Sequence, residues 1–226
     1  MKKYAFLLLF LLLTSLAEAG GRILFVPLDD RPVCLDYTAD TFKAAGWDIE
    51  TPPRDIIASF DHNGEPDELY AWLASNATGS SAVVVSSDSM IYGGLVGSRT
   101  HKFSEQELAE RTTRLLQFKQ KLGSIPVYVF TTVMRSPKAS SAPVEPAYYK
   151  EYGSQLFRLG ALTDKNEVVG LTKSETKERL SLGKAIPETI LRDLYSRRSK
   201  NLAVTERLLA GTENGSFDYL LLGRDD

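Results

Sequence analysis

The chain has 226 residues, a formal net charge of −2, 43% hydrophobic residues and a single cysteine. The near balance of charge argues against a nucleic-acid-binding surface, which would show a clustered basic excess. One cysteine cannot form an internal disulfide, so the fold must rest on a hydrophobic core, and the chain is long enough to build one.

The first 19 residues have the pattern of a secretory signal peptide. Two lysines are followed by a short apolar core at residues 6–13, and Ala17-Glu18-Ala19 fits the small-residue cleavage rule. The apolar run is far shorter than the roughly 20 residues that span a bilayer. We therefore expect cleavage before Gly20 and export to the periplasm or the extracellular space, with no membrane span left after cleavage.

The remainder of the chain alternates predicted strands and helices, which is typical of a parallel α/β fold. Strands are expected at residues 23–28, 47–51, 82–85, 127–133 and 219–222, and helices at 36–45, 104–122, after Pro66 and after Pro187. We expect one α/β domain over residues 20–226 with a mainly parallel sheet. It would form part of a (β/α) barrel or an open Rossmann-like sheet.

Two further features concern the second half of the chain. Residues 136–147 contain three prolines and three serines, so they are predicted to form a loop that could serve as a lid or substrate-contact segment. The final strand should be followed by a covering helix, as in other parallel sheets. We therefore expect the chain to be the N-terminal part of a longer protein.

Polar and charged residues follow four of the predicted strands, where parallel α/β proteins gather their ligand-binding and catalytic groups. The candidate catalytic carboxylates are Asp29, Asp30, Asp88, Asp225 and Asp226. A glycosidase needs one carboxylic acid and one carboxylate beside the scissile bond. A divalent-metal hydrolase needs several oxygen ligands, so a metal remains possible although no cofactor is evident.

Candidate substrate-binding residues lie beside these carboxylates. They are Arg31, Tyr92, Arg99, His101 and Arg135. An arginine presents a planar fork to a carboxylate or phosphate, although a salt bridge to a neighbouring aspartate is an equally good explanation for Arg135. The glycines of segment 92–99 would allow the backbone to approach a ligand closely, and a flexible polar loop is an equally good interpretation of the segment. Solvent exposure is the commoner fate of a histidine placed like His101.

Several segments together resemble the bacterial domain-of-unknown-function family 4127. They are residues 25–32, 87–99, 152–153, 157–159, 198–201 and 218–226, of which Pro27-Leu28-Asp29-Asp30-Arg31-Pro32 is the most specific. The resemblance implies a longer protein and lends no catalytic roles. It does imply that Asp29, Asp30, Arg31, Asp88, Tyr92, Arg99, Asp225 and Asp226 belong to one shared site.

These observations leave three functional hypotheses open. The leading one is an exported hydrolase that acts on carbohydrate or cell-envelope material, with a small-molecule or polysaccharide substrate. The second is a divalent-metal hydrolase that uses the same aspartates. The third is a non-catalytic carbohydrate or envelope-polymer binding protein, with Tyr92, Trp72 or Trp47 lining its groove.

Overall fold

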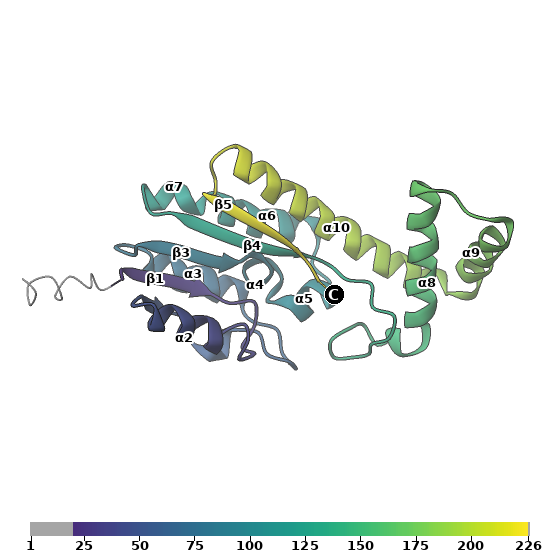
Figure 1. Ribbon diagram of the computed structural model, residues 1–226, viewed down its shortest axis with the longest axis horizontal. Helices are drawn as coiled ribbons and strands as arrows, with labels where there is room; N and C mark the ends of the chain where they lie inside the picture. The colour runs from purple at the N-terminus through teal and green to yellow at the C-terminus, as the bar shows by residue number, and fades with distance from the viewer. Residues whose placement is uncertain (1–19, 226) are drawn as a thin grey trace, which may run out of the picture.

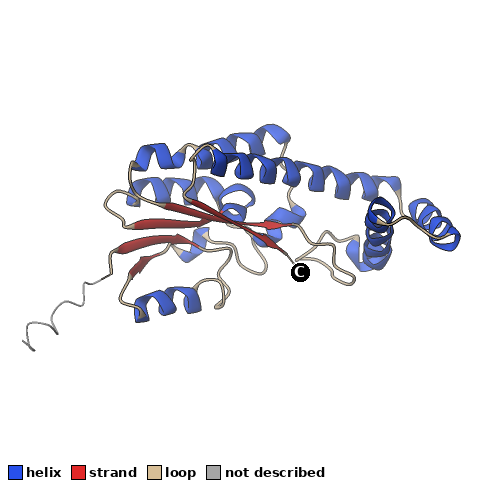
Figure 2. Ribbon diagram, turned by 45° about the horizontal axis from the view of Figure 1, so that its top comes forward, coloured by secondary structure: helices blue, strands red, loops and turns tan. Residues whose placement is uncertain are grey.

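The computed structural model describes residues 20–225, and it contains an open, five-stranded, all-parallel sheet (Figures 1 and 2). The strands are β1 (Arg22–Val26), β2 (Asp48–Glu50), β3 (Ala82–Ser86), β4 (Val127–Val133) and β5 (Tyr219–Arg224), in the order β2-β1-β3-β4-β5. The α/β prediction is confirmed, and of its two forms the open sheet is correct. The predicted signal peptide and Asp226 lie outside the described residues.

The helices follow the strands as the sequence pattern predicts. They are α2 (Asp36–Ala44), α3 (Pro66–Asn76), α4 (Ser87–Tyr92), α5 (Leu95–Thr100), α6 (Glu105–Leu116), α7 (Phe118–Leu122), α8 (Tyr149–Val168), α9 (Lys173–Ala185) and α10 (Glu188–Glu213), with a 3-10 turn at Arg54–Ile56. In residues 20–225, no helix combines the length and apolar character needed to cross a membrane.

Two predicted segments differ from the structure. The predicted helix 104–122 keeps its capping box at Ser104 and Glu107 but breaks at Gln117, so that α7 begins with the buried Phe118. The predicted loop 92–99 is instead the junction of two short helices. Gly93 and Gly94 adopt positive φ angles of 83° and 116°, which end α4 and allow α5 to start at once.

The main core lies on one face of the sheet. Inward-facing residues of the central strands pack there against helices α3, α6, α7 and α10. The strands contribute Leu24, Val26, Val83, Val85 and Val127, and the helices contribute Leu69, Leu108, Phe118 and Leu208. A second, smaller cluster joins α8, α9 and α10 around Leu156, Leu159 and Leu194. The long helix α10 contributes to both clusters and so connects the sheet to the helical lobe (Figure 1).

The other face of the sheet is only partly covered. Helix α2 packs beside β2, whereas β3, β4 and β5 face the viewer of Figure 1 with no helix in front of them. Tyr128 pairs with Tyr219 and Phe130 with Leu221, and Tyr219 and Leu221 are 57% and 56% exposed. Both faces of parallel sheets are usually buried, so this is an unusually apolar surface.

Candidate functional site

The strand order places a switch point at the middle of the sheet. After β1 the chain adds β2 on one side and then returns to add β3 on the other, which is the order of flavodoxin-like doubly wound sheets. Ligands of such sheets bind outside the carboxyl ends of the strands, near the strands that flank this point. The predicted polar clusters follow β1, β3, β4 and β5 at this edge.

A cavity of about 420 Å³ opens at the carboxyl edge of the sheet. Its charged lining consists of four arginines and two aspartates, Arg31, Arg99, Arg135, Arg224, Asp29 and Asp225. These residues come from the segments after β1 and β4, from α5 and from the end of β5. Five of the ten predicted site residues therefore line one cavity: Asp29, Arg31, Arg99, Arg135 and Asp225.

The segment after β1 holds Asp29 by a local ion pair. The Arg31 Nε donates to both Asp29 carboxylate oxygens at 2.9 and 3.0 Å, and the Arg31 backbone N–H donates to Oδ1 at 3.2 Å. The carboxylate is nearly buried, whereas about half of the Arg31 side chain is exposed. Asp30 does not line the cavity, so only one of the two adjacent aspartates faces it.

A buried ion pair joins α5 to the end of β5. Arg99 donates from Nε and Nη2 to the two oxygens of Asp225, both at 2.8 Å, and the two side chains are 5% and 4% exposed. Arg99 Nη1 also donates to the Val144 carbonyl at 3.4 Å. This two-pronged geometry holds the Asp225 carboxyl group in a fixed orientation.

The proline-rich segment 136–147 is a loop, as predicted, and its only acid anchors it to the site. Glu145 is buried and accepts from Arg135 Nε at 2.8 Å, with Arg99 Nη1 at 3.7 Å. Burial raises the pKa of Glu145, and the two guanidinium groups oppose that rise. Arg135 therefore forms a salt bridge with Glu145, an acid that was not among the expected aspartate partners.

Asp88 lies behind the cavity wall, in the first turn of α4. It is fully buried, and its Oδ2 accepts from the Thr132 backbone N–H at 3.0 Å while its Oδ1 has no hydrogen-bond partner. Burial raises the pKa of Asp88 to about 7, with a smaller contribution from the charge of Asp225 and with Thr132 opposing the rise. Thr132 itself lines the cavity, and its buried hydroxyl also lacks a partner.

His101 and Tyr92 belong to a buried cluster and do not line the cavity. The His101 ring stacks on Tyr92 at 5.1 Å, and its Nε2 shares a 2.8 Å hydrogen bond with the Asn201 side chain. His101 is only 5% exposed because the aromatic rings and α10 enclose it, and burial lowers its pKa to about 4. The substrate-binding role predicted for these two residues stays a prediction.

Two further expectations concern metals and aromatic residues. Within residues 20–225, no group of three His, Cys, Asp or Glu side chains could hold a metal ion, and the predicted site residue Asp226 lies outside this range. Trp72 packs against the main core, so the aromatic groove expected for a binding protein is not built from it. The aromatic residue that does line the cavity is Phe60, which is 64% exposed.

A family model described as "Protein of unknown function (DUF4127)" matches residues 23–226, nearly the whole described chain. The chain belongs to the DUF4127 family. Neither a curated protein nor a solved structure shows significant similarity to it. The family match includes every residue of the cavity lining, but it assigns no role to any of them.

Several residues of this DUF4127 site were not predicted, and four of them bear on its chemistry. Phe60, Thr132, Glu145 and Arg224 all line or support the cavity. Arg224 directly precedes the predicted Asp225, and Glu145 is the only acid in the proline-rich loop. Those two could have been suspected from their positions. Phe60 lies several residues after the end of the short strand β2, and no local sequence pattern indicates that it belongs to a site.

Gly94 sets the close packing of the DUF4127 site, and we expect Gly94→Ala to destabilise the protein. Its φ is 116°, and an added Cβ would lie 2.4 Å from the Ala58 Cβ and 3.2 Å from the Leu28 carbonyl oxygen. The expected loss is about 1–3 kcal/mol in the free energy of unfolding. Urea unfolding measures it, with Gly183→Ala on α9 as the control because no atom lies within 4 Å of its added Cβ. Equal effects of the two substitutions would contradict the expectation.

Proposed function

We propose that this DUF4127 protein is a hydrolase that acts on carbohydrate or cell-envelope material at the strand-end cavity. The observation that carries the proposal is the meeting of Asp29 and Asp225, from opposite ends of the described chain, in the lining of one cavity beside the switch point. Asp88, whose pKa is raised to about 7, lies directly behind that lining. When the surroundings of two carboxyl groups give them different pKa values, one can act as the acid and the other as the base.

Asp29 is the better candidate for the base. Both oxygens of Asp225 are engaged by the buried Arg99, whereas the partner of Asp29 is the half-exposed Arg31, which a substrate could displace. Asp29 would accept a proton from the attacking water as the water oxygen bonds to the sugar carbon. The glycosidic C–O bond would break at the same carbon.

Asp88 is the candidate source of the leaving-group proton. It does not line the cavity, but Thr132 does, and the unpartnered Thr132 hydroxyl lies next to the Asp88 carboxyl. In this proposal Asp88 passes its proton to the Thr132 oxygen as that hydroxyl gives its own proton to the leaving oxygen. Asp88 would act near neutral pH because about half of a group with a pKa near 7 is then protonated.

One observation favours a binding protein as the second candidate. Both aspartates that line the cavity are already paired with arginines, so they could serve to hold the arginines in place for an anionic ligand. In that case the ligand would bind without being converted. A test of the proposed function must therefore measure product and not binding alone.

The test is the release of reducing ends from purified bacterial peptidoglycan and from polygalacturonate. We expect the DUF4127 protein to release them, and Asp29→Asn to lower the rate at least 100-fold, within the range for loss of a general base. Asp40→Asn is the matched control, since Asp40 is an exposed aspartate on α2 outside the cavity. No release from either polymer, or equal rates for the two variants, would contradict the proposal.

A further inference from the structure

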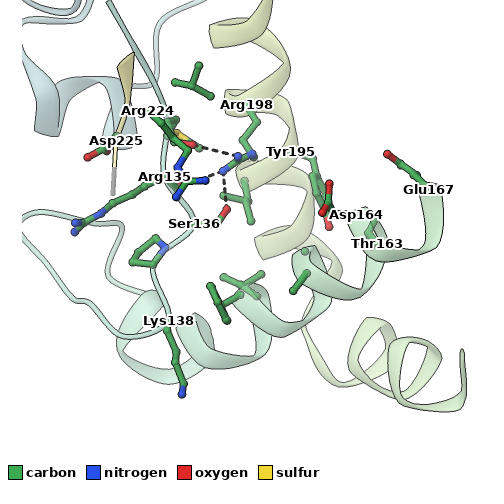
Figure 3. A pocket seen from close by; sticks show the side chains of 18 residues that line it. Arg135, Ser136, Lys138, Thr163, Asp164, Glu167, Tyr195, Arg198, Arg224 and Asp225 are labelled. Atoms are coloured by element: carbon green, nitrogen blue, oxygen red, sulfur yellow. Dashed lines mark hydrogen bonds between the residues drawn. The ribbon is translucent and has the colours of Figure 1, made fainter. Parts of the chain in front are cut away.

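A second cavity adjoins the first on the side of the helical lobe. It has a volume of about 690 Å³ and lies between the end of β4, the end of β5, α8 and α10 (Figure 3). Arg135, Arg224 and Asp225 line both cavities. The ends of β4 and β5 are thus a shared wall, and the two cavities form one extended cleft.

The charges in this cleft are unevenly distributed. Figure 3 shows Arg135 and Arg224 at the strand ends with Arg198 of α10 beside them, Asp164 and Glu167 on α8 at the opposite side, and Lys138 apart from both groups. Among residues 20–225, Arg198 donates only to neutral acceptors, namely the carbonyls of Met134 and Arg135 and the Ser136 hydroxyl. Its positive charge is therefore not neutralised by these contacts.

Arg224 provides the most accessible positive charge at the junction. It is exposed, and its guanidinium makes no hydrogen bond or ion pair with another residue in the range 20–225. By contrast, Arg99 is held by Asp225 and Arg31 by Asp29. An anionic group at the junction would meet the Arg224 fork and the field of Arg198.

The part of the second cavity that lies away from the strand ends can contact the less polar face of a ligand. Phe157 and Tyr195 line it and are 37% and 46% exposed, so that part of each ring is open to a ligand. A sugar ring presents a C–H face that can pack on an aromatic ring, while its hydroxyls can donate to Asp164 and Glu167. Both requirements are met by neighbouring units of a glycan.

We propose that the two cavities form one cleft for an anionic glycan strand, in which a carboxylate or phosphate group lies against Arg224 and the next unit packs on Tyr195. The proposal rests on the proposed function for its reaction, and it adds the substrate class and the binding path. A strand of several units would occupy both cavities, whereas a single unit would fill only one. Affinity should therefore increase with both length and charge.

Calorimetric titration of the full chain with tetragalacturonate, galacturonate and maltotetraose tests this inference. We expect the acidic tetramer to bind at least 10-fold more tightly than the acidic monomer or the neutral tetramer, in line with added charge-assisted hydrogen bonds. A glycerol phosphate tetramer replaces the carboxylates by phosphates, and the tighter of the two acidic tetramers identifies the anion. Equal affinity for the acidic and the neutral tetramer, or no binding of either acidic tetramer, would overturn the proposal.

Two variant pairs locate the binding path. Arg224→Gln should weaken binding of the acidic tetramer about 10-fold, whereas Arg158→Gln should not, because Arg158 pairs with Glu178 outside the cleft. Tyr195→Ala should weaken binding of the acidic tetramer but not binding of the acidic monomer. Tyr37→Ala is its control, because Tyr37 is an exposed tyrosine on α2. If Arg224→Gln and Arg158→Gln bind the tetramer equally well, the proposal fails.

The same samples separate this inference from the proposed function. Chromatography of each mixture after titration shows whether the tetramers have been cleaved. Binding with the expected dependence on length and charge, but without products, would refute the hydrolase and support the cleft. Products formed without that dependence would support the hydrolase and refute the cleft.

Discussion

Replacing Arg99 by methionine is expected to lower the free energy of unfolding by about 3–5 kcal/mol. Arg99 and Asp225 are 5% and 4% exposed and share two hydrogen bonds of 2.8 Å. The substitution leaves the Asp225 carboxylate in the interior without its counter-charge, which is the costly way to break a buried pair. It also removes the donor to Val144, which helps to hold the proline-rich loop.

Urea unfolding at pH 7 measures this loss. Arg158→Gln is the control, because its ion pair with Glu178 has side chains that are 45% and 42% exposed and should contribute little to stability. The double variant Arg99→Met with Asp225→Leu should recover much of the stability, since it removes both charges together. A loss below 1 kcal/mol for Arg99→Met alone would show that the pair is not buried in solution.

Asp88→Asn is expected to stabilise the protein at neutral and alkaline pH but not in acid. The pKa of Asp88 is about 7 in the folded chain, against an ordinary value near 4 for an aspartate in an unfolded one. Between these values the folded state retains a proton that the unfolded state has released, so wild-type stability falls as the pH rises. The total fall from this group is about 4 kcal/mol, complete once the pH exceeds 7.

Asparagine does not titrate, so the variant does not lose this part of its free energy of unfolding as the pH rises. The stabilities of the two proteins should therefore agree below pH 4 and differ by about 4 kcal/mol above pH 7. Urea unfolding of both proteins from pH 4 to pH 8 measures the difference, in which the titration of all other groups cancels. Parallel stability curves would mean that Asp88 titrates normally, and the acid role proposed for it would then fail.

Much of the fold could be predicted from local pattern. The apolar runs at β1, β3, β4 and β5 identify parallel strands, and the Ser104 and Glu107 capping box identifies the start of α6. Strand ends of a parallel sheet meet at one edge, so the grouping of Asp29, Arg31, Arg135 and Asp225 followed from strand positions alone. The choice between a barrel and an open sheet did not, because it depends on which strands pair.

The errors arise where contacts distant in sequence decide the outcome. His101 follows a short helix in a polar stretch, yet Asn201, a hundred residues later, and two aromatic rings bury it. Segment 92–99 contains three glycines, which suggests a loop, but the packing of Gly94 against Ala58 makes it the junction of two helices. Arg135 pairs with Glu145, whose position follows from the path of the proline-rich loop.

The central claim is that the strand-end cleft is the ligand site of this DUF4127 protein, and a crystal structure of the protein with tetragalacturonate tests it most directly. The account predicts density for the ligand across the wall formed by Arg135, Arg224 and Asp225, with a carboxylate within hydrogen-bond distance of the Arg224 guanidinium. Ligand density on another part of the surface, or an empty cleft in crystals saturated with the tetramer, would contradict it.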